Sequence, residues 1–581
     1  MKKWITIVCC LLGITSIAQV EIGEQFMDTY RELYNEQVYV HQNTSLALAG
    51  EKLLFSVYVL QPNLSPSGLS QVAYLKLIHN NEAVFSQKIK LKDGVGTGDF
   101  TVPSSLATGN YKLIAYTQWM RNFGSDGFFQ SDVHIINPYT LNPQAISATD
   151  AQAPRLQDTK RETVPNQQNL IGLWIEKDSY APREKVNLSL KPAHNPNSYG
   201  NYSISVRAIN PKSLSESEAA TLLATSIPQV KQAAFKDNKV YPPEINGELI
   251  TGTVIDKQTN LPSPKLDLTF SMAKHPNLFK VTATNSLGVF YFDLPQAYQK
   301  DRALIEVLDH SGKEFEVKVA PAVKMNTNNI RYTPLQLATT DLAWLRKRSI
   351  DNQIENAYFG AKFDRPIVVE DDPLFYAIDF NYELDEYKRF PSVQETLVEV
   401  VEHVFTSNEN GKRVISIRDY QTKRDDELAP LILIDGVFIT DHDDFLNFNV
   451  ASIKSIGVIV DKFVYGAHYF QGVLIVSTFD GNYQGKEKPT NQAILEMEPV
   501  AQVKSFFQPA YDLSDERKRI PDYRTQLFWE PIIKLTGPQA DFSFFTSDNE
   551  GWYEVSIQGF TFSGEPVSIT ERFEVRKKKE N

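Results

Sequence analysis

Hydrophobic and polar residues alternate along much of this chain with the period of two that β-strands show. Residues 38–60 and 173–190 show the alternation plainly, between short polar breaks. Two almost continuous apolar runs, Leu431–Ile434 and Gly472–Val476, predict strands that are buried on both faces. Residues 335–360 instead place leucines at helical intervals, and this spacing predicts a helix. The pattern as a whole predicts a mainly β chain.

The composition changes after the first group of predicted strands. Residues 139–169 are rich in Gln, Asn, Thr, Pro and Ala and hold few large apolar side chains. Such a composition is typical of a linker. At 581 residues the chain exceeds what one hydrophobic core supports, and its length predicts about four or five domains.

The first residues have the pattern of a secretory signal. Two lysines precede an apolar run over residues 4–14, and small residues at 16–18 supply a cleavage site. The run is too short to span a bilayer, so we expect residues 1–18 to be a signal peptide. Both cysteines, Cys9 and Cys10, lie in this run, which excludes disulfides and cysteine nucleophiles from the exported chain. A lipid-modified cysteine is the alternative that stays open.

The charge of the chain bears on its partners. Its net charge is −12, and Lys and Arg gather only in the last few residues. Binding to phosphates requires clustered Lys and Arg, so the sequence argues against a nucleic-acid partner.

The stretch from Pro430 to Thr478 carries a characteristic order of residues. A proline and an apolar strand precede Asp-Gly-Val, and two further strands follow, the last of which begins after a Tyr-Gly pair. This order resembles the plug domain of TonB-dependent outer-membrane receptors, in the form common in Bacteroidota. The matching positions are Pro430, Asp435, Gly436, Ile453, Ile456, Val458, Tyr465, Gly466, Phe470, Gly472, Val473 and Thr478. The resemblance implies a small α+β domain over residues 370–485, with a short helix in 390–401.

A receptor of that family continues into a transmembrane barrel. A barrel that encloses a plug has about 22 strands. Residues 479–581 are too few to form one. We therefore expect the plug-like domain to serve no barrel of its own.

Two further segments resemble known domain families. The first strands resemble an MG2-type macroglobulin domain, and residues 243–322 resemble a carboxypeptidase-regulatory-like sandwich. The MG2 likeness is carried by Ala49, Gly50, Glu51, Leu53, Phe55, Val57, Gly98, Phe100, Pro103, Leu106, Gly109, Tyr111, Leu113, Ala115, Tyr116, Trp119, Met120, Asn122 and Phe123. The likeness to a carboxypeptidase-regulatory-like sandwich is carried by Gly252, Val254, Asp256, Pro262, Pro264, Thr284, Gly288, Phe290, Phe292 and Leu294. Tyr180, Arg183, Glu184 and Val186 repeat part of the macroglobulin pattern.

These patterns predict a mainly β protein of tandem β-sandwich domains, macroglobulin-like or immunoglobulin-like, plus one small α+β plug-like domain. The expected divisions are a signal peptide at 1–18, an MG2-like sandwich at 19–138, a linker at 139–169, a second macroglobulin-like sandwich at 170–235, a carboxypeptidase-regulatory-like sandwich at 243–322, a helical connector at 325–369, the plug-like domain at 370–485 and a C-terminal β-sandwich at 503–581.

The sequence offers little catalytic chemistry. It contains no His-Glu-x-x-His pair, no Gly-x-Ser-x-Gly elbow and no Walker loop. The thioester of macroglobulins proper requires a cysteine, which the exported chain lacks. Carboxylates in 370–372 and 441–445 are suited to calcium, but solvated loops and helix caps account for such runs as well. We expect no enzyme activity, no cofactor and no metal.

Candidate contact residues come from the plug-like motif and from the aromatic side chains. Asp435, Gly436, Tyr465, Gly466 and Phe470 are candidates for binding a partner of the plug-like domain. The aromatic candidates are Trp119, Phe123, Phe128, Phe129, Trp529 and Trp552, which are suited to stack on a sugar or to anchor a protein. The alternatives are a turn role for the Asp-Gly pair and a core role for the aromatic residues.

The resemblances imply a non-enzymatic scaffold or interaction protein of the cell envelope. We expect it in the periplasm or at the outer membrane, accessory to a transport or secretion complex and attached through a barrel or another envelope protein. Two alternatives stay open at this point: a non-covalent endopeptidase inhibitor and a glycan-binding surface protein. The sequence does not name the partner.

Overall fold

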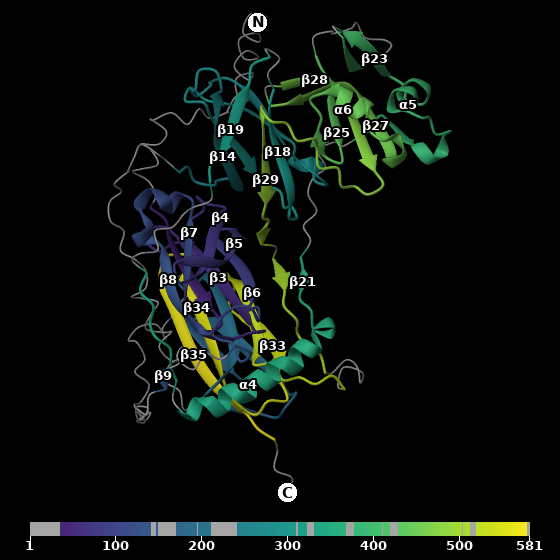
Figure 1. Ribbon diagram of the computed structural model, residues 1–581. Coiled ribbons are helices and arrows are strands. Elements are labelled where there is room, and N and C mark those ends of the chain that lie inside the picture. Colours follow the sequence, from purple (N-terminus) through teal and green to yellow (C-terminus); the bar gives the residue numbers. More distant parts are fainter. Residues whose placement is uncertain are drawn as a thin grey trace, which may run out of the picture. The chain divides into compact units, whose positions relative to one another are not determined.

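A computed structural model describes most of the chain (Figure 1). The described residues are 35–140, 147–148, 170–193, 196–210, 241–308, 312–321, 330–337, 339–367, 377–409, 411–418, 428–466, 468–501, 503–511 and 519–577. The expected signal peptide and most of the expected linker lie outside them. The structure consists mostly of strands arranged in sandwiches, so the predicted fold class is confirmed.

The first sandwich, sandwich 1, packs two sheets with strand orders β1-β3-β6 and β2-β8-β7-β4-β5. Its strands are β1 (Gln37–Gln42), β2 (Leu46–Leu48), β3 (Lys52–Leu60), β4 (Val72–His79), β5 (Glu82–Lys90), β6 (Val95–Thr101), β7 (Gly109–Thr117) and β8 (Phe129–Ile136). The alternating apolar residues meet between the sheets, where Val57, Leu75 and Tyr111 are fully buried. This burial is the main force that holds the sandwich together.

The second sandwich, sandwich 2, is built from two distant parts of the chain (Figure 1). Its sheets have the orders β10-β12-β33 and β11-β35-β34-β13-β32. The strands are β10 (Ile171–Ile175), β11 (Ser179–Tyr180), β12 (Lys185–Pro192), β13 (Gly200–Ile209), β32 (Gln526–Leu535), β33 (Ala540–Phe545), β34 (Gly551–Thr561) and β35 (Pro566–Val575).

The expectation of separate sandwiches at 170–235 and 503–581 is therefore wrong. Strand β13 pairs with β34 on one side and with β32 on the other. Its successive residues 202–206 are all buried, so both faces of the strand are covered. In the described part of 170–235 the strands are β10 to β13, and the C-terminal strands β32 to β35 complete the sandwich.

The third sandwich, sandwich 3, also receives a strand from elsewhere in the chain. Its sheets have the orders β17-β14-β19 and β16-β15-β18-β29. The strands are β14 (Glu248–Asp256), β15 (Asp267–Met272), β16 (Lys280–Ala283), β17 (Val289–Leu294), β18 (Asp301–Val307), β19 (Phe315–Val319) and β29 (Gln492–Met497). Strand β29 follows the plug-like segment, so the plug-like unit is an insertion within sandwich 3.

The plug-like unit has one sheet of order β22-β27-β28-β25-β26. Its elements are β22 (Phe380–Glu383), α5 (Val393–Glu399), β23 (Val404–Glu409), β24 (Lys412–Ile417), β25 (Leu431–Ile434), β26 (Val437–Phe438), α6 (His442–Leu446), β27 (Ile453–Tyr465) and β28 (His468–Thr478). The residues Leu397 and Phe445 of the two helices pack with Ile432 and Leu474 in one core. A second apolar cluster joins the sheet to Phe279 of sandwich 3.

Short elements connect the sandwiches. Helix α4 (Thr339–Ala357) lies in the expected connector, and its Arg348 donates to Glu51 of sandwich 1 at 2.7 and 2.6 Å. The remaining strands are β9 (Ser147–Ala148), which pairs with β20 (Gln336–Leu337), β21 (Arg365–Pro366), which pairs with β31 (Lys504–Ser505), and β30 (Val500–Ala501), which pairs with β5. Among the described residues, no helix is long and apolar enough to cross a membrane.

The Glu51 carboxylate explains how α4 is held. Burial opposes its ionisation, but the guanidinium groups of Arg348 and Arg207 outweigh this effect and lower the pKa of Glu51. The Leu48 amide also donates to it at 3.0 Å. This buried ion pair fixes the end of the β2–β3 turn against the helix that borders the site described next.

Candidate ligand-binding cleft

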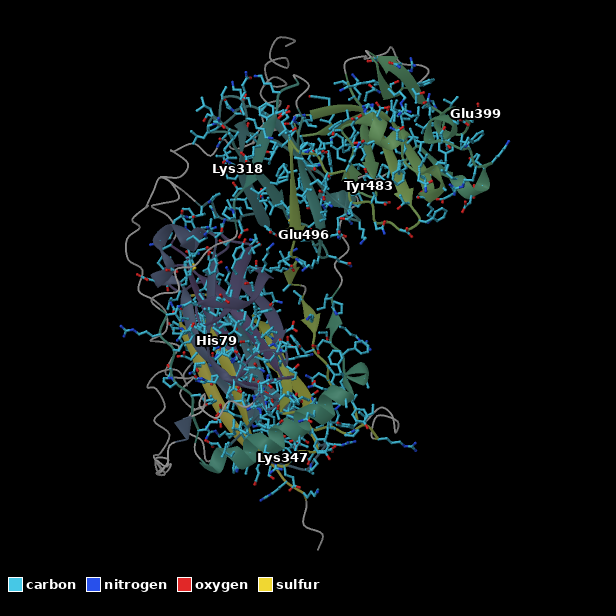
Figure 2. The ribbon with its side chains drawn as sticks, viewed as in Figure 1. His79, Lys318, Lys347, Glu399, Tyr483 and Glu496 are labelled. Atoms are coloured by element: carbon cyan, nitrogen blue, oxygen red, sulfur yellow. The ribbon has the colours of Figure 1, made fainter. Side chains whose placement is uncertain are left out.

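Two adjoining cavities lie where α4 ends, with volumes of about 180 and 400 Å³. They share the residues Lys362, Phe506, Phe507 and Gln508, and we call them together the cleft. Five parts of the chain form it: the turn before β3 with the start of that strand, Arg207 of β13, the end of α4 with the residues after it, the segment 505–511, and residues 520–529, which include the start of β32. Side chains are drawn in Figure 2, which labels Lys347 on α4.

Aromatic side chains form much of the wall. Phe359 and Phe363 are 54% and 50% exposed, and Phe506 and Phe507 are half-buried. Trp529 lies deeper, in the wall of the smaller cavity, and is 3% exposed. Aromatic surface that is exposed at the wall of a cavity is a common feature of binding sites.

Most charges of the cleft are already paired. Lys52 lies 2.5 Å from Asp364, and Lys362 lies 2.7 Å from Glu355. The two carboxylates also accept from backbone amides, Asp364 from Phe507 at 3.0 Å and Glu355 from Tyr523 at 2.6 Å. These contacts tie α4 and the residues after it to the segments that bring in the aromatic side chains.

An acidic residue, Asp522, is among those that line the larger cavity. Burial opposes the ionisation of Asp522, but Arg524 and a hydrogen bond from Tyr511 lower its pKa. The Tyr511 hydroxyl donates to Asp522 at 2.5 Å, and Arg524 donates to it at 2.7 Å. Asp522 is thus an ionised, satisfied structural carboxylate.

Arg365 differs from these residues. It is exposed, lines the larger cavity and lies 5.8 Å from the centre of the Phe363 ring. Among the described residues it forms no ion pair. In the described part of the chain, no three His, Cys, Asp or Glu side chains are grouped so that they could hold a metal ion. With its described residues, the cleft therefore offers aromatic contacts and the accessible positive charge of Arg365.

The candidates at the Asp-Gly turn have internal roles. Asp435 and Gly436 adopt φ values of 48° and 91°, as a tight turn requires. The Asp435 carboxylate accepts from the Thr478 amide at 2.8 Å and from its hydroxyl at 2.6 Å. The Asp435 carbonyl accepts from the Lys274 amide of sandwich 3 at 2.7 Å. The turn thus joins two strands of the plug-like unit and fastens the unit to sandwich 3.

Tyr465 and Phe470 lie together at the contact with sandwich 3. Their rings are 5.7 and 6.3 Å from the ring of Phe279, and burial raises the pKa of Tyr465 to about 12. Gly466, with a φ of 60°, makes the hairpin turn between them and has open space around it. This side of the sheet is already covered by the chain itself.

The aromatic candidates of sandwich 1 are separate from this group. Trp119 is fully buried, and its ring lies 5.8 Å from that of the half-buried Phe123. An indole without exposed surface offers no contact to a partner, so its role is in the core. Of the aromatic candidates, Trp529 is the one that lines the cleft.

Sequence reasoning missed the rest of the cleft. The local signal was the placing of large aromatic residues, at 358–363 and 506–507, in segments without a strand or helix period. Such a signal does not show that these segments meet, because they are separated by more than a hundred residues.

Neither a protein-family model nor a curated protein matches the chain. Solved structures do match loosely. Salmonella alpha-2-macroglobulin reacted with methylamine is 9% identical, with a TM-score of 0.22, over 94% of this chain and 40% of that one. The native Escherichia coli alpha-2-macroglobulin is 11% identical, with a TM-score of 0.24, over 94% and 40%. Dimeric latent PorU from Porphyromonas gingivalis is 9% identical, with a TM-score of 0.16, over 49% and 34%. The chain spans about two fifths of the macroglobulins, and likeness this loose transfers no function to it.

Proposed function

We propose that this chain is a non-enzymatic, exported protein of the cell envelope that binds another protein through the cleft. The observation that carries the proposal is a set of exposed apolar side chains: Phe359 and Phe363, which line the cleft, and Ile367 and Val503, which lie in the adjoining paired segments. Strand pairing holds the last two together, since the Ile367 amide donates to the Val503 carbonyl at 2.8 Å. Aromatic anchors at a concave site are typical of protein-binding surfaces.

The way the chain is interleaved supports a scaffold role. In the sequence, residues 241–511 lie between the two groups of strands that form sandwich 2. The plug-like unit likewise lies between β19 and β29 of sandwich 3. Each enclosed part is held at both of its ends by a sheet. A body of this kind presents the cleft from segments that are fixed at several points, and such pre-organisation lowers the cost of binding.

The partner that we propose is an outer-membrane barrel or another envelope protein of a transport or secretion complex. The support for it is the resemblance of residues 370–485 to a receptor plug. The plug-like sheet already packs on Phe279 of sandwich 3, so we assign the docking role to the cleft and not to the plug-like motif. Endopeptidase inhibition and glycan binding gain no observation of their own from the described residues.

The test is recovery of the partner from native membranes. A C-terminally tagged chain is cross-linked in living cells and purified from the outer-membrane fraction, alongside Phe363→Ser and a matched control, Leu287→Ser. Leu287 is 70% exposed on sandwich 3 and takes no part in the cleft. We expect one envelope protein with the wild type and with the control, and its loss with Phe363→Ser. The same recovery from the wild type and both variants contradicts the proposal.

A further inference from the structure

We infer that the cleft binds an extended peptide segment in which a large apolar side chain is followed by an acidic group. This inference deepens the proposed function and rests on it. The cavities of about 180 and 400 Å³ are of a size for one or two side chains and too small for a folded domain. Their aromatic walls are suited to the apolar side chain.

Charge identifies the second element of the peptide. The charges of Lys52, Lys362 and Arg524 are neutralised by carboxylates of the chain itself. Arg365 lines the larger cavity beside Phe363 and has no carboxylate partner among the described residues. A guanidinium binds a carboxylate with two parallel hydrogen bonds, which favours an acidic group beside the apolar anchor.

Two residues that line the smaller cavity each carry a buried polar atom without a partner, and these atoms point to the backbone of the peptide. Gln508 Oε1 is buried and receives no hydrogen bond, and Trp529 Nε1 is buried and donates none, within the part of the chain that the structure describes. Both residues line the same cavity. One atom lacks a donor and the other lacks an acceptor, and a peptide group supplies one of each. Leaving such atoms unpaired costs free energy, and a bound peptide recovers it when the two side chains turn toward the cavity.

The probes are fluorescein-labelled peptides Gly-Ser-X-Asp-Ser-Gly, in which X is Phe, Leu or Trp. Matched peptides carry Asn or Lys in place of Asp, or Ser in place of the apolar residue. Fluorescence anisotropy with the full chain measures each Kd. We expect the acidic peptide with an apolar anchor to bind about threefold to tenfold more tightly than its Lys form, as one partly exposed ion pair provides. Peptides with Ser at the anchor position do not bind measurably.

Variants of the chain place the binding at the cleft. Arg365→Glu should reverse the preference, so that the Lys peptide binds more tightly than the Asp peptide, while Arg346→Glu, an exposed control on α4, should leave it unchanged. Trp529→Phe keeps the ring but removes the donor, and should weaken all peptides about threefold to tenfold. Circular dichroism confirms that each variant folds.

The outcomes separate this inference from the proposed function. An Arg365→Glu chain without a reversed preference overturns the inference, as does the absence of saturable binding at about 1 mM peptide, the weak end of specific affinity. The peptide test can fail while the Phe363→Ser chain still recovers no partner from membranes. That combination means that the cleft binds a protein by another chemistry. Equal binding of polysaccharide probes at the cleft also overturns the inference.

Discussion

A buried carboxyl between sandwich 1 and sandwich 3 should make the stability of the chain depend on pH. Glu244 is 1% exposed, and its Oε1 accepts from the Tyr74 hydroxyl at 2.8 Å and the Leu249 amide at 3.0 Å. Its Oε2 has no partner among the described residues. Burial raises the pKa of Glu244 from 4.5 to about 8, and Glu248 adds to the shift while Lys88 opposes it.

The sign of the effect follows from this raised pKa. Between about pH 4.5 and about pH 8 the folded chain keeps a proton at Glu244 that the unfolded chain has released. The stability that the protonated carboxyl provides is fully present below the pKa of the unfolded chain, 4.5. It is lost as the pH rises through the pKa of the folded chain, about 8. One proton changes the free energy of unfolding by about 1.4 kcal/mol per pH unit, or about 4 kcal/mol between pH 5 and pH 8.

The test is Glu244→Gln, which mimics the protonated carboxyl at every pH. Urea unfolding is measured between pH 5 and pH 8, and hydrogen exchange of residues 72–79 and 248–256 reports on the two sandwiches separately. Relative to the wild type, the variant should become more stable as the pH rises, with a slope that differs by about one proton. Glu82→Gln, at an exposed position of β5, is the control. Parallel pH profiles of Glu244→Gln and the wild type refute the reasoning.

Three further changes test the fold. Arg348→Met leaves Glu51 buried with one guanidinium fewer and should cost about 3–5 kcal/mol in chemical unfolding, whereas Arg346→Met should cost almost nothing; equal effects contradict the assigned role of α4. Deletion of residues 526–581 removes both strand partners of β13, so limited proteolysis should cleave within 170–210 but spare sandwich 1. Protection of 170–210 as well as sandwich 1 would argue against the shared sandwich. Gly436→Ala should cost about 1 kcal/mol or more in thermal unfolding, because φ is 91° and the new Cβ would lie 2.9 Å from the Met272 carbonyl oxygen; an unchanged melting temperature contradicts it.

The sequence predicts the strands of this protein better than their partners. The alternation of apolar residues is local, and it correctly indicates strands in 38–60 and 173–190. Pairing between β13 and β34 joins segments that lie more than 300 residues apart, and no local pattern encodes that distance. A strand such as β29 is short and looks alike whether it ends the plug-like unit or completes sandwich 3. For this reason the expected domain boundaries missed the interleaving.

The candidate site shows the same limit. The plug-like motif marked Asp435 and Phe470 because they match a pattern, and the structure gives them internal contacts with Thr478 and Phe279. The cleft depends on five segments meeting in space. Its phenylalanines could be noticed in the sequence. That Arg365 lines a cavity without a carboxylate partner among the described residues, and that polar atoms of Gln508 and Trp529 are unpaired, follows only from tertiary structure.

The most direct test of the central claim places a photo-reactive amino acid at Phe363 in the native organism. The same residue at Leu287 is the control, since it is exposed on sandwich 3 outside the cleft. After irradiation of living cells, mass spectrometry identifies the proteins attached at each position. We predict that position 363 forms a specific adduct with one envelope protein and that position 287 does not. Identical adducts at both positions, or none at 363, would contradict the assignment of the cleft as a protein-binding site.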